Sequence, residues 1–164
     1  MKKLSLLLLI GFFGITSISY IGCAKKSEPT AEEKAKVEIA LTGFVETLNS
    51  VNIDSASSYG YLQSYLEKNT FIYGAAYAIP PSDSASYATY VFLKDGKGIK
   101  KSLASYESAE WYKGPVKEQK GFWSNPYFDN EGGETNMITY SIPVYSKDSL
   151  NTLLYVVTSD LELK

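Results

Sequence analysis

The order of two hydrophobic periodicities along the chain constrains the fold more than any other feature. Up to Lys68, apolar residues recur at the three- and four-residue spacing of amphipathic helices. From Phe71 onward, short runs rich in aromatic and β-branched residues indicate strands. Helices that precede a set of strands predict an α+β domain, in which the helices cover one face of an antiparallel sheet.

Local signals predict where the two helices lie. Thr30 and Glu33 form a capping-box pattern, which predicts that the first helix begins at residue 31. Its apolar stripe must pack on a partner, and it consists of Val37, Leu41, Phe44, Val45 and Leu48. A second helix is predicted from residue 54 or 55 to residue 68.

The rest of the chain predicts five strands and one long excursion. The strands are expected over 71–79, 86–93, 99–103, 136–146 and 151–163. Asp95 and Gly96 supply the tight turn of a hairpin. The excursion, residues 106–133, lacks a clean period, and one short helix is predicted around 108–112. Excursions of this length are often functional.

The N-terminus predicts export and attachment to a membrane. Lys2 and Lys3 precede an apolar run that is too short for a membrane-spanning helix, as in a secretory signal. Gly22 before Cys23 fits the cleavage site of a lipoprotein. We therefore expect a lipoprotein signal peptide over 1–22 and a tether over 23–30, lipidated with palmitate at Cys23.

An uncleaved anchor helix with a free thiol is the alternative at Cys23. Both interpretations place residues 31–164, predicted to form a single domain, in the cell envelope outside the cytoplasm. Whether the anchor lies in the inner or the outer membrane stays open. Cys23 is the only cysteine, so no disulfide can form within the chain.

Charge and composition exclude several classes of function. The formal charge is −2, and it becomes −4 without Lys2 and Lys3, so we expect no nucleic-acid partner. The chain has no histidine, which excludes Ser-His-Asp and Cys-His catalysis and argues against zinc.

The acidic segment 129–134 leaves two minor alternatives open. It offers oxygen atoms to calcium but lacks the spacing of an EF-hand loop, so we expect no metal and no cofactor. Asp129 with Glu131 or Glu134 could supply the paired acids of a hydrolase. Nothing else supports catalysis, and we expect a protein that is not an enzyme.

A series of motifs between residues 106 and 163 occurs in a specific order. It comprises Trp111-Tyr112, Pro115, Trp123, the group Pro126, Tyr127 and Asp129, the group Thr139, Tyr140, Ser141 and Pro143, and Asp160. In this order the motifs resemble the membrane-distal module of Cache domains, the PAS-like extracellular sensors of bacterial kinases and chemoreceptors.

The resemblance implies a fold and a site. The expected fold is a long N-terminal helix packed on a five-stranded antiparallel sheet. A small molecule is expected to bind between that sheet and the excursion. The residues implied to line or brace this pocket are Trp111, Tyr112, Trp123, Tyr127, Asp129, Tyr140 and Asp160.

The two aspartates have alternative roles that the sequence leaves open. A carboxylate among aromatic rings suits an amine or another cation. Asp129 lies just before Asn130 and Gly132, so it is equally suited to accept backbone amide bonds in a turn. Asp160 is favoured slightly for contact with ligand or for bracing the pocket.

Two positions depart from relatives that sense free amino acids. Those relatives carry an arginine two residues before the Trp-Tyr pair and a tyrosine five residues before that arginine, where this chain has Ala109 and Ala104. A guanidinium there would clamp a carboxylate. Its absence argues against a free α-amino acid as the ligand. The expected ligand classes are an amine, an amino-acid-like molecule or an organic acid.

The resemblance and the predicted lipid together suggest a lipid-anchored binding protein. A lipid anchor cannot itself carry a signal through the membrane, so an envelope signalling protein is an expected partner. The alternative is a structural or partner-binding lipoprotein, in which the pocket is filled by its own side chains and takes no free ligand.

Overall fold

The computed structural model describes residues 28–82, 87–149 and 152–163. The elements are α1 (Ala31–Leu48), α2 (Ser55–Lys68), β1 (Gly74–Ala78), β2 (Ala88–Lys94), β3 (Lys97–Leu103), the short 3-10 helix η1 (Tyr106–Ser108), α3 (Glu110–Glu118), β4 (Phe122–Trp123), β5 (Tyr127–Phe128), β6 (Asn136–Tyr145) and β7 (Leu153–Glu162). The predicted signal peptide and Cys23 lie outside the described residues.

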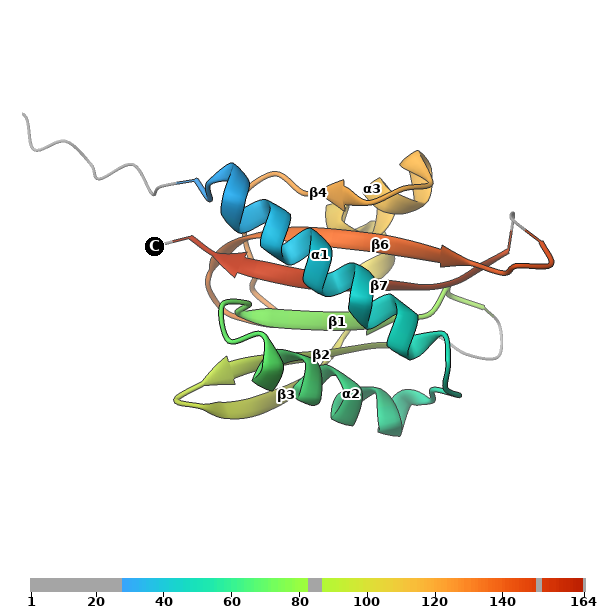
Figure 1. Ribbon diagram of the computed structural model, residues 1–164, viewed down its shortest axis with the longest axis horizontal. Helices are drawn as coiled ribbons and strands as arrows, with labels where there is room; N and C mark the ends of the chain where they lie inside the picture. The colour runs from blue at the N-terminus through green and yellow to red at the C-terminus, as the bar shows by residue number, and fades with distance from the viewer. Residues whose placement is uncertain (1–27, 83–86, 150–151, 164) are drawn as a thin grey trace, which may run out of the picture.

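The sheet is antiparallel, and its longer strands are β1, β2, β3, β6 and β7 (Figure 1). Their order is β3-β2-β1-β7-β6, and the two-residue strands β4 and β5 both pair with β6. Consecutive strands are neighbours except where β7 lies between β1 and β6. The predicted α+β fold, a long first helix on a five-stranded sheet, is confirmed.

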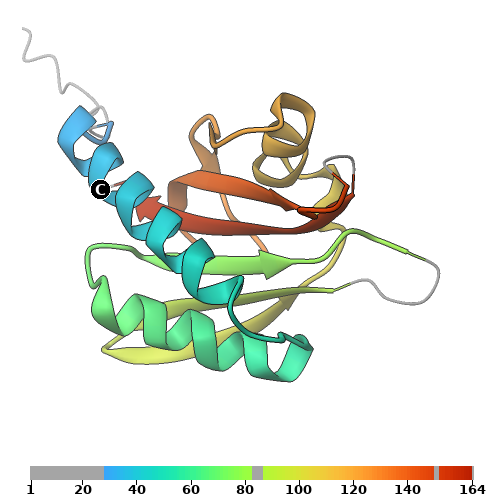
Figure 2. The ribbon, with the colours of Figure 1, turned by 45° about the vertical axis from the view of Figure 1, so that its right-hand side comes forward.

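Both long helices begin where their capping residues predict. Thr30 and Glu33 bond each other's backbone amides, and Asp54 and Ser57 do the same at α2. Both helices cover the same face of the sheet (Figure 2). The α1 side chains buried against that face are Val37, Leu41, Phe44 and Leu48, and those of α2 are Ser58, Leu62, Tyr65 and Leu66.

The excursion covers the opposite face of the sheet. Successive side chains of a strand point to opposite faces, so Ile138 and Tyr140 of β6 pack with the helices while Thr139, between them, faces the excursion. Because Thr139 pairs with Asp160 of β7, these two side chains share that second face. The predicted short helix in this region is longer than expected and contains Pro115.

The hairpin of β2 and β3 turns where the sequence predicts. Asp95 and Gly96 have φ values of 51° and 73°. Two successive residues in the left-handed region match the right-handed twist of the flanking strands, and glycine adopts this conformation at low cost.

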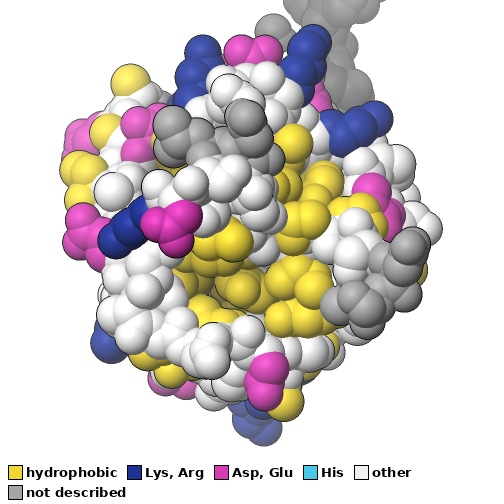
Figure 3. Space-filling view, turned by 90° about the vertical axis from the view of Figure 1, so that its right-hand side faces the viewer, with side chains coloured by type: hydrophobic (Ala, Val, Ile, Leu, Met, Phe, Trp, Pro, Cys, Tyr) yellow, Lys and Arg dark blue, Asp and Glu magenta, His cyan; other side chains and the backbone are white. Residues whose placement is uncertain are grey.

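The described chain begins and ends at the same end of the molecule (Figure 1). At the opposite end, apolar side chains are visible in a hollow of the surface (Figure 3). Val51, shortly after α1, and Leu154, in β7, are exposed apolar residues. In the part of the chain that the structure describes, no helix combines the length and the apolar character that crossing a bilayer requires.

Packing of α1 on the sheet predicts a difference between two of its aliphatic side chains. Leu41 is fully buried, whereas Ile39 is 74% exposed. Leu41→Ala should lower the free energy of unfolding by about 2–5 kcal/mol because it leaves a cavity in the core. Ile39→Ala, the matched control, should change it by less than about 0.5 kcal/mol. Urea denaturation of both variants checks this, and equal losses would contradict the assigned helix face.

Candidate functional site

A small cavity lies between the sheet and the excursion. Its floor is formed by sheet residues, namely Ala76, Tyr90, Thr139, Thr158 and Asp160. Its roof is formed by Trp111, Tyr127 and Asp129 of the excursion, and Leu103, the last residue of β3, also borders it. The cavity volume is about 20 Å³. A single water needs roughly 10–15 Å³ on this measure, so the cavity has room for about one water.

Asp160 is the buried charge-bearing group of the floor. Its side chain is 2% exposed, and the Thr139 hydroxyl donates to its Oδ1 at 2.7 Å. Burial raises the pKa of Asp160 to about 7, although the Thr139 and Tyr90 hydroxyls oppose this and the nearby Asp129 adds to it. The carboxyl group therefore changes its charge close to neutral pH.

Thr139 connects the roof to the floor. Its hydroxyl lies 2.8 Å from the Tyr127 hydroxyl as well as 2.7 Å from Asp160. A hydroxyl has one proton to donate. Because Thr139 donates that proton to Asp160, it accepts the proton of Tyr127, and the three groups form an ordered chain.

Tyr90 is a floor residue that the sequence did not single out. It is buried, and among the described residues its hydroxyl has no hydrogen-bond partner of acceptable geometry. It nevertheless lies near enough to Asp160 to lower the pKa of that carboxyl group. A Cβ on Gly74 would collide with the Tyr90 hydroxyl and would lie 2.9 Å from Asp160 Oδ2, so both groups gather around one glycine.

Asp129 holds the roof loop in shape. Its Oδ1 accepts the backbone amides of Glu131 and Gly132 at 3.2 and 3.1 Å, and its Oδ2 accepts that of Gly133 at 2.7 Å. These three bonds support the turn-bracing role. The carboxylate still borders the cavity, where it contributes negative charge opposite Asp160.

An open groove of about 330 Å³ adjoins the cavity. The groove and the cavity share Leu103, Trp111, Tyr127 and Asp129. Glu110 and Glu131 add carboxylates to the groove, and no lysine is among the described residues that line either space. The chain contains no arginine. The site is therefore aromatic and acidic, without a fixed positive charge.

A model of one protein family matches residues 58–164, which is more than half of the 164-residue chain. The family is described as methyl-accepting chemotaxis protein-like, first PDC sensor domain. The chain belongs to this family. The predicted kinship with Cache, or PDC, sensor domains is thereby confirmed. A search of the curated proteins found no match.

Solved structures with the same fold include an extracellular domain and the ligand-binding domains of chemoreceptors. The extracellular domain of mmHK1S-Z3, described as a histidine kinase, has a TM-score of 0.65 and 21% identity. The ligand-binding domain of the Pseudomonas aeruginosa PAO1 amino acid chemoreceptor PctC, in complex with GABA, has values of 0.57 and 16%. That of the Campylobacter jejuni chemoreceptor Tlp3, in complex with 4-methylisoleucine, has values of 0.53 and 14%.

Each of these three matches covers 80% of this chain. The share of the solved chain that is covered is 52% for mmHK1S-Z3, 56% for PctC and 53% for Tlp3. The chain thus spans about half the length of the structures that it resembles.

Four of the seven predicted site residues of this PDC domain surround the cavity. They are Trp111, Tyr127, Asp129 and Asp160. Ala104 and Ala109, at the two positions that depart from amino-acid sensors, line the adjoining groove. These four residues lie in the excursion and the last strand, and ligand contact by them stays a prediction.

The other three predicted residues do not border the cavity. Trp123 and Tyr140 pack with the α1 side of the sheet. Trp123 Nε1 donates to Glu38 of α1 at 2.8 Å, and its ring lies 5.1 Å from that of Tyr140. Tyr112 packs edge-on against Tyr106 at 5.2 Å. These aromatic residues brace α1 and α3 and do not line the cavity between the sheet and the excursion.

Two of the three acids considered for a hydrolase, Asp129 and Glu134, have other partners. Asp129 accepts three backbone amides, as described above, and Glu134 forms an ion pair with Lys101 at 2.9 Å. The described residues contain no group of three or more potential ligands that could hold a metal ion.

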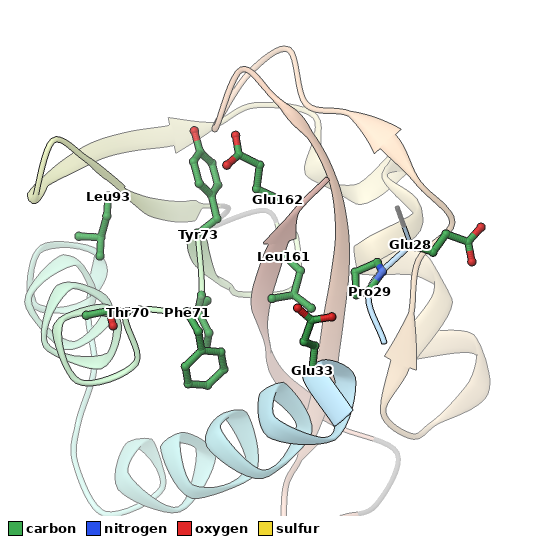
Figure 4. Close-up of a pocket in the computed structure, with 10 residues that line it drawn as sticks. Glu28, Pro29, Glu33, Thr70, Phe71, Tyr73, Leu93, Leu161 and Glu162 are labelled. Carbon is green, nitrogen blue, oxygen red and sulfur yellow. The ribbon is translucent and has the colours of Figure 1, made fainter. Parts of the chain in front are cut away.

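A second cavity of about 330 Å³ lies where the described termini meet (Figure 4). Glu28, Glu33 and Glu162 line it together with Phe71 and Tyr73. Glu33 is already bonded to Thr30 in the capping box, and Glu162 accepts the Thr135 hydroxyl at 3.0 Å. This cavity lies apart from the excursion, and two of its three carboxylates serve the fold.

The raised pKa of Asp160 predicts that the domain loses stability as pH rises. The ordinary pKa of this carboxyl group is 3.8, and in the fold it is about 7. Between these values the native state keeps a proton that the unfolded state has lost. The contribution of Asp160 to the free energy of unfolding should therefore fall by about 1.4 kcal/mol for each pH unit and level off above pH 7.

Asp160→Asn tests this dependence because the amide is uncharged and nearly isosteric. Compared with the unsubstituted protein, the variant should lack this slope and should be more stable at pH 8. Urea denaturation of both proteins at several pH values between 5 and 8 measures the difference. Parallel curves would show that Asp160 is not the titrating group.

Proposed function

We propose that this PDC domain is a lipid-anchored binding protein that captures a small molecule outside the cytoplasm for sensing. The observation that carries the proposal is the acidic, aromatic site between the sheet and the excursion, with Asp160 buried at its floor. Family membership supports a sensor role. The lipoprotein signal pattern that ends at Cys23 supports the anchor and the extracytoplasmic location.

The electrostatics of the site favour an amine as the ligand. Asp129 and Asp160 border the cavity, and Glu110 and Glu131 border the groove, without any lysine or arginine among the described lining residues. An anionic ligand would meet like charge without a neighbouring cation, whereas an ammonium group would be attracted by the carboxylates and the aromatic rings. Organic acids, one of the predicted classes, are therefore disfavoured.

The ligands of two related structures also carry an amino group, but their carboxyl group has no evident binding partner in this site. PctC was solved with GABA and Tlp3 with 4-methylisoleucine, and both ligands carry an amino and a carboxyl group. Ala104 and Ala109 leave this groove without a side chain that could clamp a carboxylate. We therefore propose amines without a carboxylate in preference to amino acids.

Capture requires the roof to move. A cavity of about 20 Å³ is too small for any organic ligand, whereas the adjoining groove of about 330 Å³ suits a small molecule. A ligand in the groove reaches Asp160 only when Trp111 and Tyr127 separate from the floor. This conformational change would be the event that an envelope signalling protein reads.

A compound screen tests the site. Amines should raise the melting temperature, since a ligand at 100 times its Kd adds about 2.7 kcal/mol to the free energy of unfolding. Trp111→Ala should abolish the response because it removes a roof side chain. Trp123→Ala, the matched control on the other face of the sheet, should keep it.

If no compound class raises the melting temperature, the ligand proposal fails. Capture of one stoichiometric envelope protein that also binds Trp111→Ala would then support the alternative of a partner-binding lipoprotein with a filled pocket. A response that both tryptophan variants lose equally would place the ligand elsewhere.

Lipidation at Cys23 predicts a clear effect of one substitution. Cys23→Ser should prevent incorporation of an alkyne-labelled fatty acid and leave the 22-residue signal attached, since the acceptor thiol is gone. Labelling, gel mobility and membrane fractionation measure this, with Ser27→Ala as a control in the same tether. Fatty-acid labelling that persists in Cys23→Ser would exclude the proposed anchor.

A further inference from the structure

We propose that Asp160 is a proton-operated gate of the ligand site: the protonated carboxyl group keeps the roof closed on the floor, and its ionisation opens the site. The proposal rests on the proposed function, because it concerns the regulation of that same site.

The closed geometry fits a neutral Asp160. Its Oδ1 accepts the Thr139 hydroxyl. Its Oδ2 lies beside the Tyr90 hydroxyl, around Gly74, and that hydroxyl has no partner among the described residues. The Tyr90 hydroxyl can donate to Oδ2 and lowers the pKa of Asp160, but it carries no charge that could compensate a carboxylate in the closed cavity.

The groups that face Asp160 do not compensate a negative charge. Tyr90 approaches from β2, Tyr127 from β5 and Asp129 from the roof loop, and burial is the main cause that raises the pKa of both tyrosines. Lys101, the register partner of Tyr90, is bonded to Glu134. Tyr73 and Tyr65, which lie further away, are tyrosines of raised pKa as well.

Ionisation is therefore incompatible with the closed cavity. A buried carboxylate needs hydration or a counter-charge, and a space for about one water supplies little of the first. Asp129 adds repulsion from the roof. Separation of Trp111 and Tyr127 from the floor would admit water, and subsequently a cation, to the carboxylate. The pKa of about 7 means that both forms of Asp160 are populated near neutral pH.

The two tryptophans of the chain make a direct test possible. The full-length protein, labelled with 5-fluorotryptophan and purified in detergent, gives one fluorine resonance from Trp111 in the roof and one from Trp123 on the opposite face. Trp123→Phe assigns them. Between pH 5.5 and 8.5 the Trp111 resonance should titrate with a midpoint near 7 and become more sensitive to exchange of H₂O for D₂O, while the Trp123 resonance stays constant.

Two variants attribute the titration to the gate. Asp160→Asn should hold the Trp111 resonance at its low-pH position at every pH. Tyr90→Phe should move the midpoint to higher pH, because the Tyr90 hydroxyl lowers the pKa of Asp160. A Trp111 resonance that does not titrate, or that titrates equally in Asp160→Asn, overturns the proposal.

The result is independent of the compound screen because no ligand is present. A titrating Trp111 resonance together with a negative screen would leave the gate in place and remove the capture function. A positive screen together with a constant Trp111 resonance would keep the capture function and remove the gate.

Discussion

The site depends on a carboxyl group that is buried without a counter-charge. Asp160 lies in the last strand at the centre of the sheet, where burial raises its pKa to about 7. Its neighbours are hydroxyl groups, which compensate a negative charge less fully than a cation would. Among the described residues, the charged group that affects its pKa is a second carboxylate, Asp129. Such a group is costly for a fold. The cost is reduced when a proton or a positively charged ligand occupies the site, and this links stability, pH and binding.

Most of the fold could be predicted from the sequence because its signals are local. Thr30 with Glu33 determines the start of α1, and Asp95-Gly96 determines the β2–β3 turn, each through contacts within a few residues. The position of β7 between β1 and β6 depends on contacts between distant parts of the chain. No local pattern carries that information, and the strand order was not predicted.

The candidate site could be predicted only in part, for a reason of strand geometry. Thr139 and Tyr140 are adjacent in β6, so their side chains must face opposite sides of the sheet. Since Asp160 pairs with Thr139, Tyr140 could not share its face. The alternation of side chains was evident from the sequence. Which of them face the excursion became known only with the strand register. Tyr90 was missed for the same reason. Its side chain borders the candidate site only because β2 and β7 lie on either side of β1, which brings Tyr90 close to Asp160.

Trp123, which lies on the face of the sheet opposite the cavity, connects the site to the first helix. Its indole donates to Glu38 of α1. The next residue, Ser124, exchanges hydrogen bonds with the backbone of Thr139, whose hydroxyl holds Asp160. One short strand end therefore contacts α1 on one face of the sheet and the floor of the site on the other. A ligand or a proton can shift the equilibrium between the closed and the open site only by the difference between its interaction free energies with the two states. A buried carboxyl group with no counter-charge makes that difference large, because the closed site penalises its ionised form and the open site hydrates it.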